Sequence, residues 1–121
     1  MELQKLDGEF TICKIDNEEH VDFSKEFVFL SKTDDEISLV CESAYVPSYA
    51  KASKIVWRGL KISGELDFEL VGVIAKITNI LAKADISVFV VSTYNTDYFF
   101  MNAENLDAGI KVLIDNGYYF R

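Results

Sequence analysis

The chain has 121 residues, of which 50% are hydrophobic and 13% aromatic. This is enough apolar material for one domain or two very small ones. An excess of acidic residues gives a net charge of −8, which repels phosphate backbones, so we expect no nucleic-acid partner. The apolar runs are short, and MELQKLDGEF lacks the regions of a secretory signal. We therefore expect a cytoplasmic protein without membrane contact.

The N-terminal half is expected to be rich in strands. Alternating residues predict a strand over residues 9–15, and the polar segment DNEEHVDFSKE that follows is too short for a full crossover helix. Residues 27–32 and 36–41 flank Thr33-Asp34-Asp35 and predict a hairpin. A short helix is predicted over residues 48–54.

The C-terminal half begins with a predicted strand over residues 56–65. Next comes a predicted amphipathic helix over residues 70–84, because apolar residues recur there at three- and four-residue steps. Its apolar positions are Leu70, Val73, Ile74, Ile77, Ile80, Leu81 and Ala84. Residues 86–91 form a continuous β-branched and aromatic run, which predicts a strand buried on both faces. Another short strand is predicted over residues 97–101.

A second helix is predicted to start at the capping residue Asn102 and to end at Asn116-Gly117. Its apolar stripe is Leu106, Ile110, Leu113 and Ile114. With a last strand over residues 118–121, the order β-α-β-β-α-β predicts an α+β, ferredoxin-like fold. We therefore expect two halves, residues 57–121 as a complete unit and residues 1–56 as a degenerate copy. No Pro/Gly linker separates them, which favours a shared core.

Patterns typical of catalysis and cofactor binding are scarce. The sequence contains no GxSxG, P-loop or GxGxxG motif, and Asp34 and Asp35 are interpreted as solvated loop acids. Cys13 and Cys41 are predicted to be reduced, buried, small hydrophobic residues. Together with His20 they lack the paired close spacing of a structural zinc site. We expect no metal, no cofactor and no enzymatic activity.

Two features of the sequence can be explained either by a structural role or by a ligand-binding role. The stretch STYNTDY (residues 92–98) joins two apolar strands; it is either a polar turn or a binding site, and a shielded Asp97 there must find donors. Gly72 is predicted in the first helical turn, where it costs helix stability. It would allow either close packing on the sheet or the approach of an anion to unused amides.

Together these residues resemble the ACT domain family. The stretch LVGVIAKITNILAKADISVFVVST is similar to its glycine-bearing helix and buried strand. The longer stretch from Asp67 to Phe120, with the turn STYNTD, resembles the ACT-like group of small bacterial proteins related to the eukaryotic cytosolic arginine sensors. FLSKTDDEISLVCESAYVP and Trp57-Arg58 are also similar to that group. Asp85 stands where the family often has glycine, so we expect a differently built turn at that helix end.

The resemblance implies a tandem pair of ACT-like units that bind an amino acid without catalysis. It implies that backbone around Leu70, Val71, Gly72 and Val73 receives the carboxylate end of the ligand. It implies further that Thr93, Tyr94 and Thr96 line the pocket and that Asp97 pairs with a cationic side chain or amino group. Ser43 and Ala44 are expected to supply the opposite wall.

The function that we expect is regulatory binding of a free amino acid, with a cationic one among the candidates, at an interface between ACT units. Because the chain has two such units and the arginine sensors have four, a homodimer is expected to complete the site. Two alternatives stay open at this point. One is a structural oligomerisation module without a ligand, and the other is a small enzyme that uses Asp97 as an acid or base.

Overall fold

The computed structural model describes residues 1–67 and 70–121 and divides the chain into two compact units. The larger unit contains Met1–Asp7 and Arg58–Arg121, and the smaller unit contains Gly8–Trp57. The first seven residues therefore pack with the C-terminal part of the chain. The expected division into ACT-like halves at residues 56 and 57 stays a prediction.

The larger unit is built on a mixed sheet with the strand order β9-β1-β6-β8-β7. Its strands are β1 (Glu2–Lys5), β6 (Trp57–Ile62), β7 (Phe89–Ser92), β8 (Asp97–Asn102) and β9 (Tyr119–Phe120). β1 is antiparallel to β6 and parallel to β9, with Leu3 opposite Ile62 and Phe120. β1 was not predicted from the sequence, although Leu3 and Leu6 are both buried. This strand separates β6 from β9, the first and last strands of the β-α-β-β-α-β unit.

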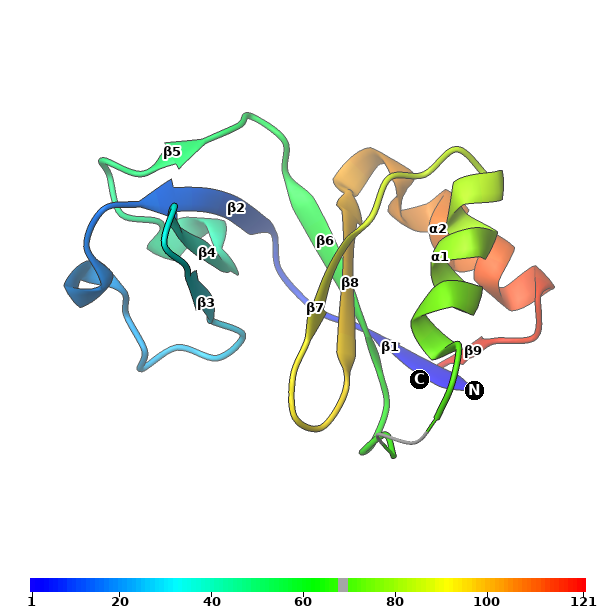
Figure 1. The fold of residues 1–121 in the computed structure, drawn as a ribbon. Helices are drawn as coiled ribbons and strands as arrows, with labels where there is room; N and C mark the ends of the chain where they lie inside the picture. Colours follow the sequence, from blue (N-terminus) through cyan, green and yellow to red (C-terminus); the bar gives the residue numbers. More distant parts are fainter. Residues whose placement is uncertain (68–69) are drawn as a thin grey trace. The chain divides into compact units, whose positions relative to one another are not determined.

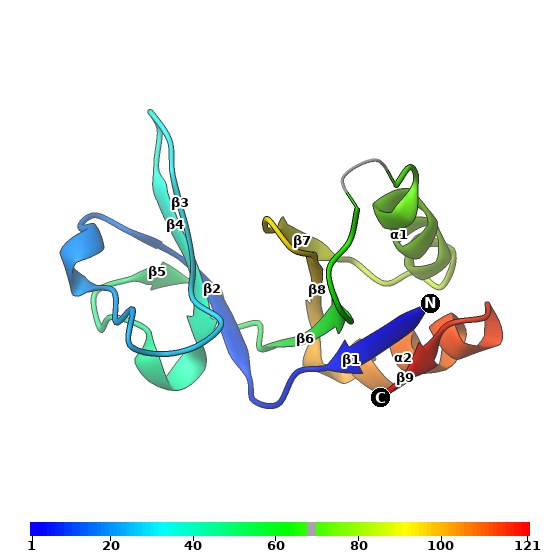
Figure 2. The ribbon, with the colours of Figure 1, turned by 90° about the horizontal axis from the view of Figure 1, so that it is seen from below.

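Two helices cover one face of this sheet. α1 (Val73–Lys83) and α2 (Leu106–Asp115) lie side by side in both views (Figures 1 and 2), and they are in contact. Their apolar faces bury Ile77, Leu81 and Leu113 against Phe99 and Met101 of β8. The core explains why the helices form, because such short helices gain most of their stability from packing of the apolar face. The ferredoxin-like α+β fold is confirmed.

Several predicted details of the helices and strands were wrong. α1 begins at Val73, so Leu70 lies outside it and is 52% exposed. Ile114 is 51% exposed, so only part of the predicted stripe on α2 is buried. The strand predicted over residues 86–91 is observed as β7, which is shorter and only partly buried. Within the described larger unit, β7 pairs only with β8 and so lies at the edge of the sheet.

Both helices end in the same left-handed turn. Asp85 has φ 61° and Gly117 has φ 94°. The amide of Ile86 donates to the carbonyl of Leu81 at 3.0 Å, and that of Tyr118 donates to Leu113 at 3.1 Å. This is the Schellman pattern, which uses the last carbonyls of the helix. The expectation of a differently built turn at Asp85 was wrong, because aspartate tolerates this conformation.

The smaller unit is strand-rich, as expected. Its strands are β2 (Phe10–Ile15), β3 (Phe29–Lys32), β4 (Ile37–Glu42) and β5 (Lys51–Ala52). They form an antiparallel sheet in which β4 lies between β3 and β2, and β5 pairs with β2. The predicted helix over residues 48–54 was wrong, because Lys51 and Ala52 instead pair with Lys14 and Cys13 of β2.

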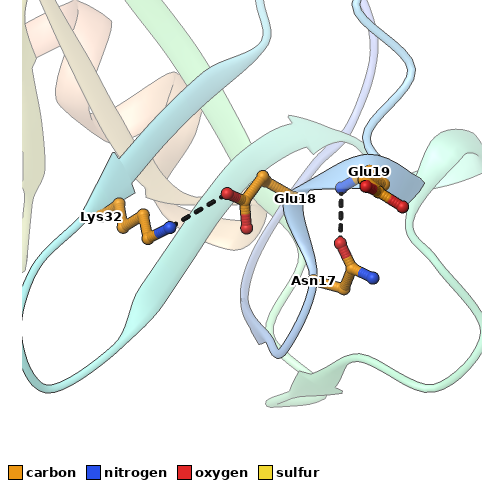
Figure 3. A network of polar contacts seen from close by, with 4 residues as sticks. All are labelled: Asn17, Glu18, Glu19 and Lys32. Carbon is orange, nitrogen blue, oxygen red and sulfur yellow. Dashed lines mark hydrogen bonds and ion pairs between the residues drawn. The ribbon is translucent and has the colours of Figure 1, made fainter.

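Two 3-10 turns complete the smaller unit, η1 (Glu18–His20) and η2 (Ser43–Tyr45). η1 stands where a complete unit has its first helix. Asn17 caps it by accepting a hydrogen bond from the Glu19 amide at 2.9 Å, and Lys32 contacts Glu18 at 3.0 Å (Figure 3). Both ionic side chains are solvent-exposed, so this pair adds little stability.

The two cysteines belong to the core of the smaller unit. Cys13 and Cys41 are free and buried, as predicted, and they pack with Ile15 and Leu39. Burial, with smaller contributions from Cys13 and Glu42, raises the pKa of Cys41 to about 11 from its ordinary 9.0. Burial also raises the pKa of Cys13. Because the folded-state pKa is raised, the Cys41 contribution to stability is complete below pH 9 and is lost as the pH rises through 11.

We expect both thiols to resist alkylation while the protein is folded. At pH 8 iodoacetamide should modify the native protein about 100-fold or more slowly than the urea-unfolded chain, because the reactive thiolate is scarce and shielded. Mass spectrometry of timed samples measures both rates. Equal rates would show that the thiols are accessible in the folded state.

The hairpins of the two units resemble each other closely. Residues 33–36 and 93–96 each form a turn in which the first threonine amide donates to the carbonyl of the last residue at 2.9 Å. In each turn the threonine hydroxyl also accepts from the last residue's amide, at 3.2 and 3.4 Å. The strands that follow, β4 and β8, have the same burial pattern, and each leads into a 3-10 turn. This likeness supports the hypothesis of a degenerate copy.

Candidate functional site

The larger unit has a cleft of about 520 Å³ between the start of α1 and the β7–β8 turn. Figure 1 shows these two segments at the same end of the unit. The cleft is lined by Leu66, Asp67, Leu70, Gly72, Val73, Ile74, Ala75, Ser92, Thr93, Tyr94, Asn95, Thr96 and Asp97. Its volume is within the range of small-molecule sites.

One wall is the β7–β8 turn, which is held by its own hydrogen bonds. The Thr93 hydroxyl donates to the Thr96 carbonyl at 3.1 Å. The Thr96 hydroxyl, which is buried, donates to the carbonyl of Ile62 at 2.9 Å and so ties the turn to β6. The Asn95 carbonyl accepts from the Leu66 amide at 2.7 Å. The turn is therefore a fixed wall, with Tyr94 projecting from it at 80% exposure.

The opposite wall is the N-terminus of α1. Gly72 is the N-cap and has φ 80°, and it provides no side chain to cap the helix. The first helical hydrogen bond runs from the Lys76 amide to the Gly72 carbonyl at 2.9 Å. The amides of Val73, Ile74 and Ala75 therefore precede the helical ladder, and no described residue accepts from them. Free amides and the helix dipole make this end favourable for a carboxylate.

Asp97 contributes a carboxylate to the same cleft. It lies at the first position of β8, opposite Ser92, and is partly buried. Within residues 1–67 and 70–121, its side chain forms no ion pair or hydrogen bond. A partly buried carboxylate without a donor loses solvation and gains nothing in exchange. The carboxylate is therefore available to a cationic group that enters the cleft.

The two hairpins differ at the position of Asp97, and this difference shows whether the turn needs the carboxylate in order to form. In the smaller unit, the residue that corresponds to Asp97 is Ile37, at the first position of β4. That unit builds the same threonine-bonded turn without an acid at this position. Formation of the turn therefore does not require Asp97.

The structure brings together most, but not all, of the residues expected at the site. Leu70, Gly72, Val73, Thr93, Tyr94, Thr96 and Asp97 all line the cleft. Val71 does not, and it is 95% exposed. Ser43 and Ala44 lie in η2 of the smaller unit, where the Ser43 hydroxyl contacts that of Thr11 at 2.8 Å.

Some lining residues of the cleft were not predicted from the sequence. Asp67 adds a second carboxylate to the cleft, and Ile74 and Ala75 extend the wall formed by α1. Leu66 and Asp67 precede the helix in an irregular segment, and periodicity gives no signal there. Their acidic and apolar character was visible, but their proximity to the β7–β8 turn depends on tertiary structure.

At Gly72 the backbone conformation, and not the available space, limits which residues the position tolerates. A Cβ placed there meets no atom within 4 Å, but the backbone is left-handed. We expect Gly72→Ala to lower the free energy of unfolding by about 1–2 kcal/mol. Gly72→Asn should cost less, because asparagine tolerates this region. Urea denaturation of both variants measures the difference, and equal, negligible effects would show that the segment adopts another conformation.

The residues that the structure describes contain neither a metal-ligand cluster nor a membrane-spanning helix. No group of three or more His, Cys, Asp and Glu side chains is placed to hold a metal ion. None of the helices in the same ranges is both long and apolar enough to span a membrane.

The fold and the cleft define a class of protein, namely small α+β modules with a ferredoxin-like core and a candidate ligand cleft. Residues 52–115 match the ACT domain family, which is more than half of the chain. The chain therefore belongs to the ACT domain family. ACT domains are typically regulatory modules that bind amino acids.

Similar sequences include a family of larger proteins. The chain is 37% identical over 59 residues to "Cytosolic arginine sensor for mTORC1 subunit 1" from Homo sapiens and from Bos taurus. The match covers 48% of this chain and 18% of each relative. The matched segment thus spans less than a fifth of the length of these relatives.

Similar solved structures cover nearly the whole chain. Protein Atu0741 from Agrobacterium tumefaciens has a TM-score of 0.87 and 25% identity, covering 99% of this chain and 91% of that one. Protein VC0802 from Vibrio cholerae, described as of unknown function and a possible transport protein, has a TM-score of 0.77 and 20% identity, covering 92% and 85%. Aspartate kinase from Clostridium acetobutylicum has a TM-score of 0.62 and 13% identity, covering 93% and 33%. The last two likenesses concern the fold alone.

Proposed function

We propose that this protein binds a free amino acid in the cleft between α1 and the β7–β8 turn, in a regulatory and not a catalytic role. The observation that carries the proposal is that one cleft offers hydrogen-bond donors for an anionic group on one wall and a carboxylate for a cationic group on the other. Uncapped amides of α1 suit the ligand carboxylate, and the unpaired Asp97 suits an amino or guanidinium group. A free amino acid presents both groups on one small molecule.

The charges of the cleft favour a cationic amino acid. Two carboxylates, Asp67 and Asp97, are among its described lining residues, and no lysine or arginine is. A basic side chain would bring a second positive charge into this acidic cleft, near the unpaired Asp97. The similar larger proteins are named as arginine sensors, which supports the same class of ligand.

A protein-contact role has its own supporting observation. Leu70, Ile74 and Tyr94 at the cleft are exposed large apolar side chains, as is the neighbouring Val71. Exposed apolar surface of this kind is typical of contacts with another protein. We infer that a partner, in the simplest case a second copy of the chain in the cytoplasm, closes over the cleft and that the ligand stabilises this arrangement. The alternative is an oligomerisation module in which the same contact forms without a ligand.

A thermal-shift screen of the twenty amino acids tests this function. A ligand at about 100 times its dissociation constant should add about 2.7 kcal/mol to the free energy of unfolding, which raises Tm by about 10 °C for a chain of this size. We expect arginine or lysine to produce the largest shift. The absence of any shift at millimolar concentrations would contradict the proposal and favour the oligomerisation module.

A further inference from the structure

A second and larger cleft lies between the two helices of the larger unit. Its volume is about 710 Å³, and it shares only Val73 with the candidate amino-acid site. Polar side chains from α1 and from the end of α2 meet in it, namely Lys76, Asn79, Lys83 and Asn116. Nothing in the function proposed above uses these groups.

The charge of this helix cleft is opposite to that of the chain. Its described lining residues include two lysines and no Asp or Glu, although the chain carries 20 acidic residues. Lys76, Asn79 and Lys83 follow at three- and four-residue steps and so share one face of α1. The two lysines are two turns apart, about 10 Å along the axis. Neither lysine forms an ion pair within the described ranges.

Asp115, an acid on the last turn of α2, is already paired. Asp115 contacts Lys111 at 3.1 Å on that helix. The Asn116 amide group donates to the Val112 carbonyl at 2.8 Å, which fixes this side chain at the end of α2. The cleft therefore offers two unpaired ammonium groups, and the polar groups of its far wall are held in place.

The rest of the cleft is suited to the apolar part of a small-molecule ligand. Val112 and Tyr118 line it and are partly buried. The Tyr118 hydroxyl is neutral at physiological pH, because its ordinary pKa is 10.0 and burial raises this pKa further. The volume is in the range of small-molecule sites.

We propose that the cleft between α1 and α2 binds a small organic anion that carries an apolar group. Its carboxylate or phosphate contacts Lys76 and Lys83, and its apolar part lies against Val112 and Tyr118. A second copy packed by two-fold symmetry at this cleft would bring lysines against lysines, because such an interface places the same patch on both sides. A small anion meets no such repulsion.

The test is an NMR titration of the full chain with phenyl phosphate and, separately, with benzoate. We expect saturable shifts of the Asn79, Lys83 and Asn116 amides, while the Thr93 and Asp97 amides stay unmoved. Preference for one probe identifies the anionic group, and benzyl alcohol serves as the uncharged probe. Binding should weaken when the salt concentration is raised.

Matched variants separate this site from the general charge of the chain. The double variant Lys76→Gln/Lys83→Gln should weaken binding about tenfold or more, because it removes two charged donors. Lys51→Gln/Lys54→Gln makes the same charge change at exposed positions of the smaller unit and should leave the affinity within about twofold. Equal losses in both variants, equal binding of benzyl alcohol, or no saturable shifts would overturn the proposal. Failure of the amino-acid screen would not, because the two clefts are tested by different ligands.

Discussion

Replacing Asp97 by asparagine is expected to weaken amino-acid binding strongly and to leave the fold intact. The substitution keeps the shape of the side chain and removes its charge, and Ile37 in the equivalent position shows that the turn needs no acid. Loss of one partner of a shielded charge pair costs about 2–5 kcal/mol of binding free energy. The dissociation constant should therefore rise by about 30-fold or more. Isothermal titration calorimetry with the amino acid found in the screen measures this change.

The control for this prediction is Asp34→Asn. Asp34 lies in the equivalent turn of the smaller unit and is exposed, and its substitution makes the same change of net charge. It should leave the affinity unchanged within about twofold. If Asp97→Asn binds as well as the natural chain, Asp97 is not the cationic subsite. If both variants bind weakly, the effect comes from the general field of the acidic surface.

The largest effect on stability is expected at Leu113. This residue is fully buried in α2 and belongs to the core of the larger unit, and its neighbour Ile114 is 51% exposed. Leu113→Ala should lower the free energy of unfolding by about 2–5 kcal/mol, because it removes buried apolar surface and leaves a cavity. Urea denaturation followed by circular dichroism measures the loss.

Ile114→Ala is the matched variant, on the same helix and with nearly the same chemistry. It should change the free energy of unfolding by less than about 1 kcal/mol, because half of the side chain is in water and alanine is a better helix former. Similar losses in the two variants would mean that Ile114 is buried, either in an oligomer or in a different orientation of α2. Repeating the measurement at several protein concentrations distinguishes these cases.

The predictions from sequence succeeded where local pattern and burial agree. The spacing of Ile77 and Leu81 follows the helical period, so the helix and its buried face could be predicted. The hairpin turns were also predictable, because their threonines bond to groups within the turn itself. The predictions were wrong at the ends of helices and strands and at exposed apolar residues such as Ile114. The burial of such a residue depends on which other helices and strands pack against it.

For this protein, the sequence by itself determined the α+β class, the family likeness and the residues of the STYNTDY turn. These depend on short-range periodicity and on motifs that are local in the chain. Only the tertiary structure decided that Met1–Asp7 adds a strand to the larger unit and that Gly72 precedes α1 in a left-handed conformation. It also decided that Asp67 and Asp97 line one cleft and that Lys76 and Lys83 line another. The reason is physical: a cleft is formed by side chains distant in sequence, and their proximity results from the packing of the whole unit.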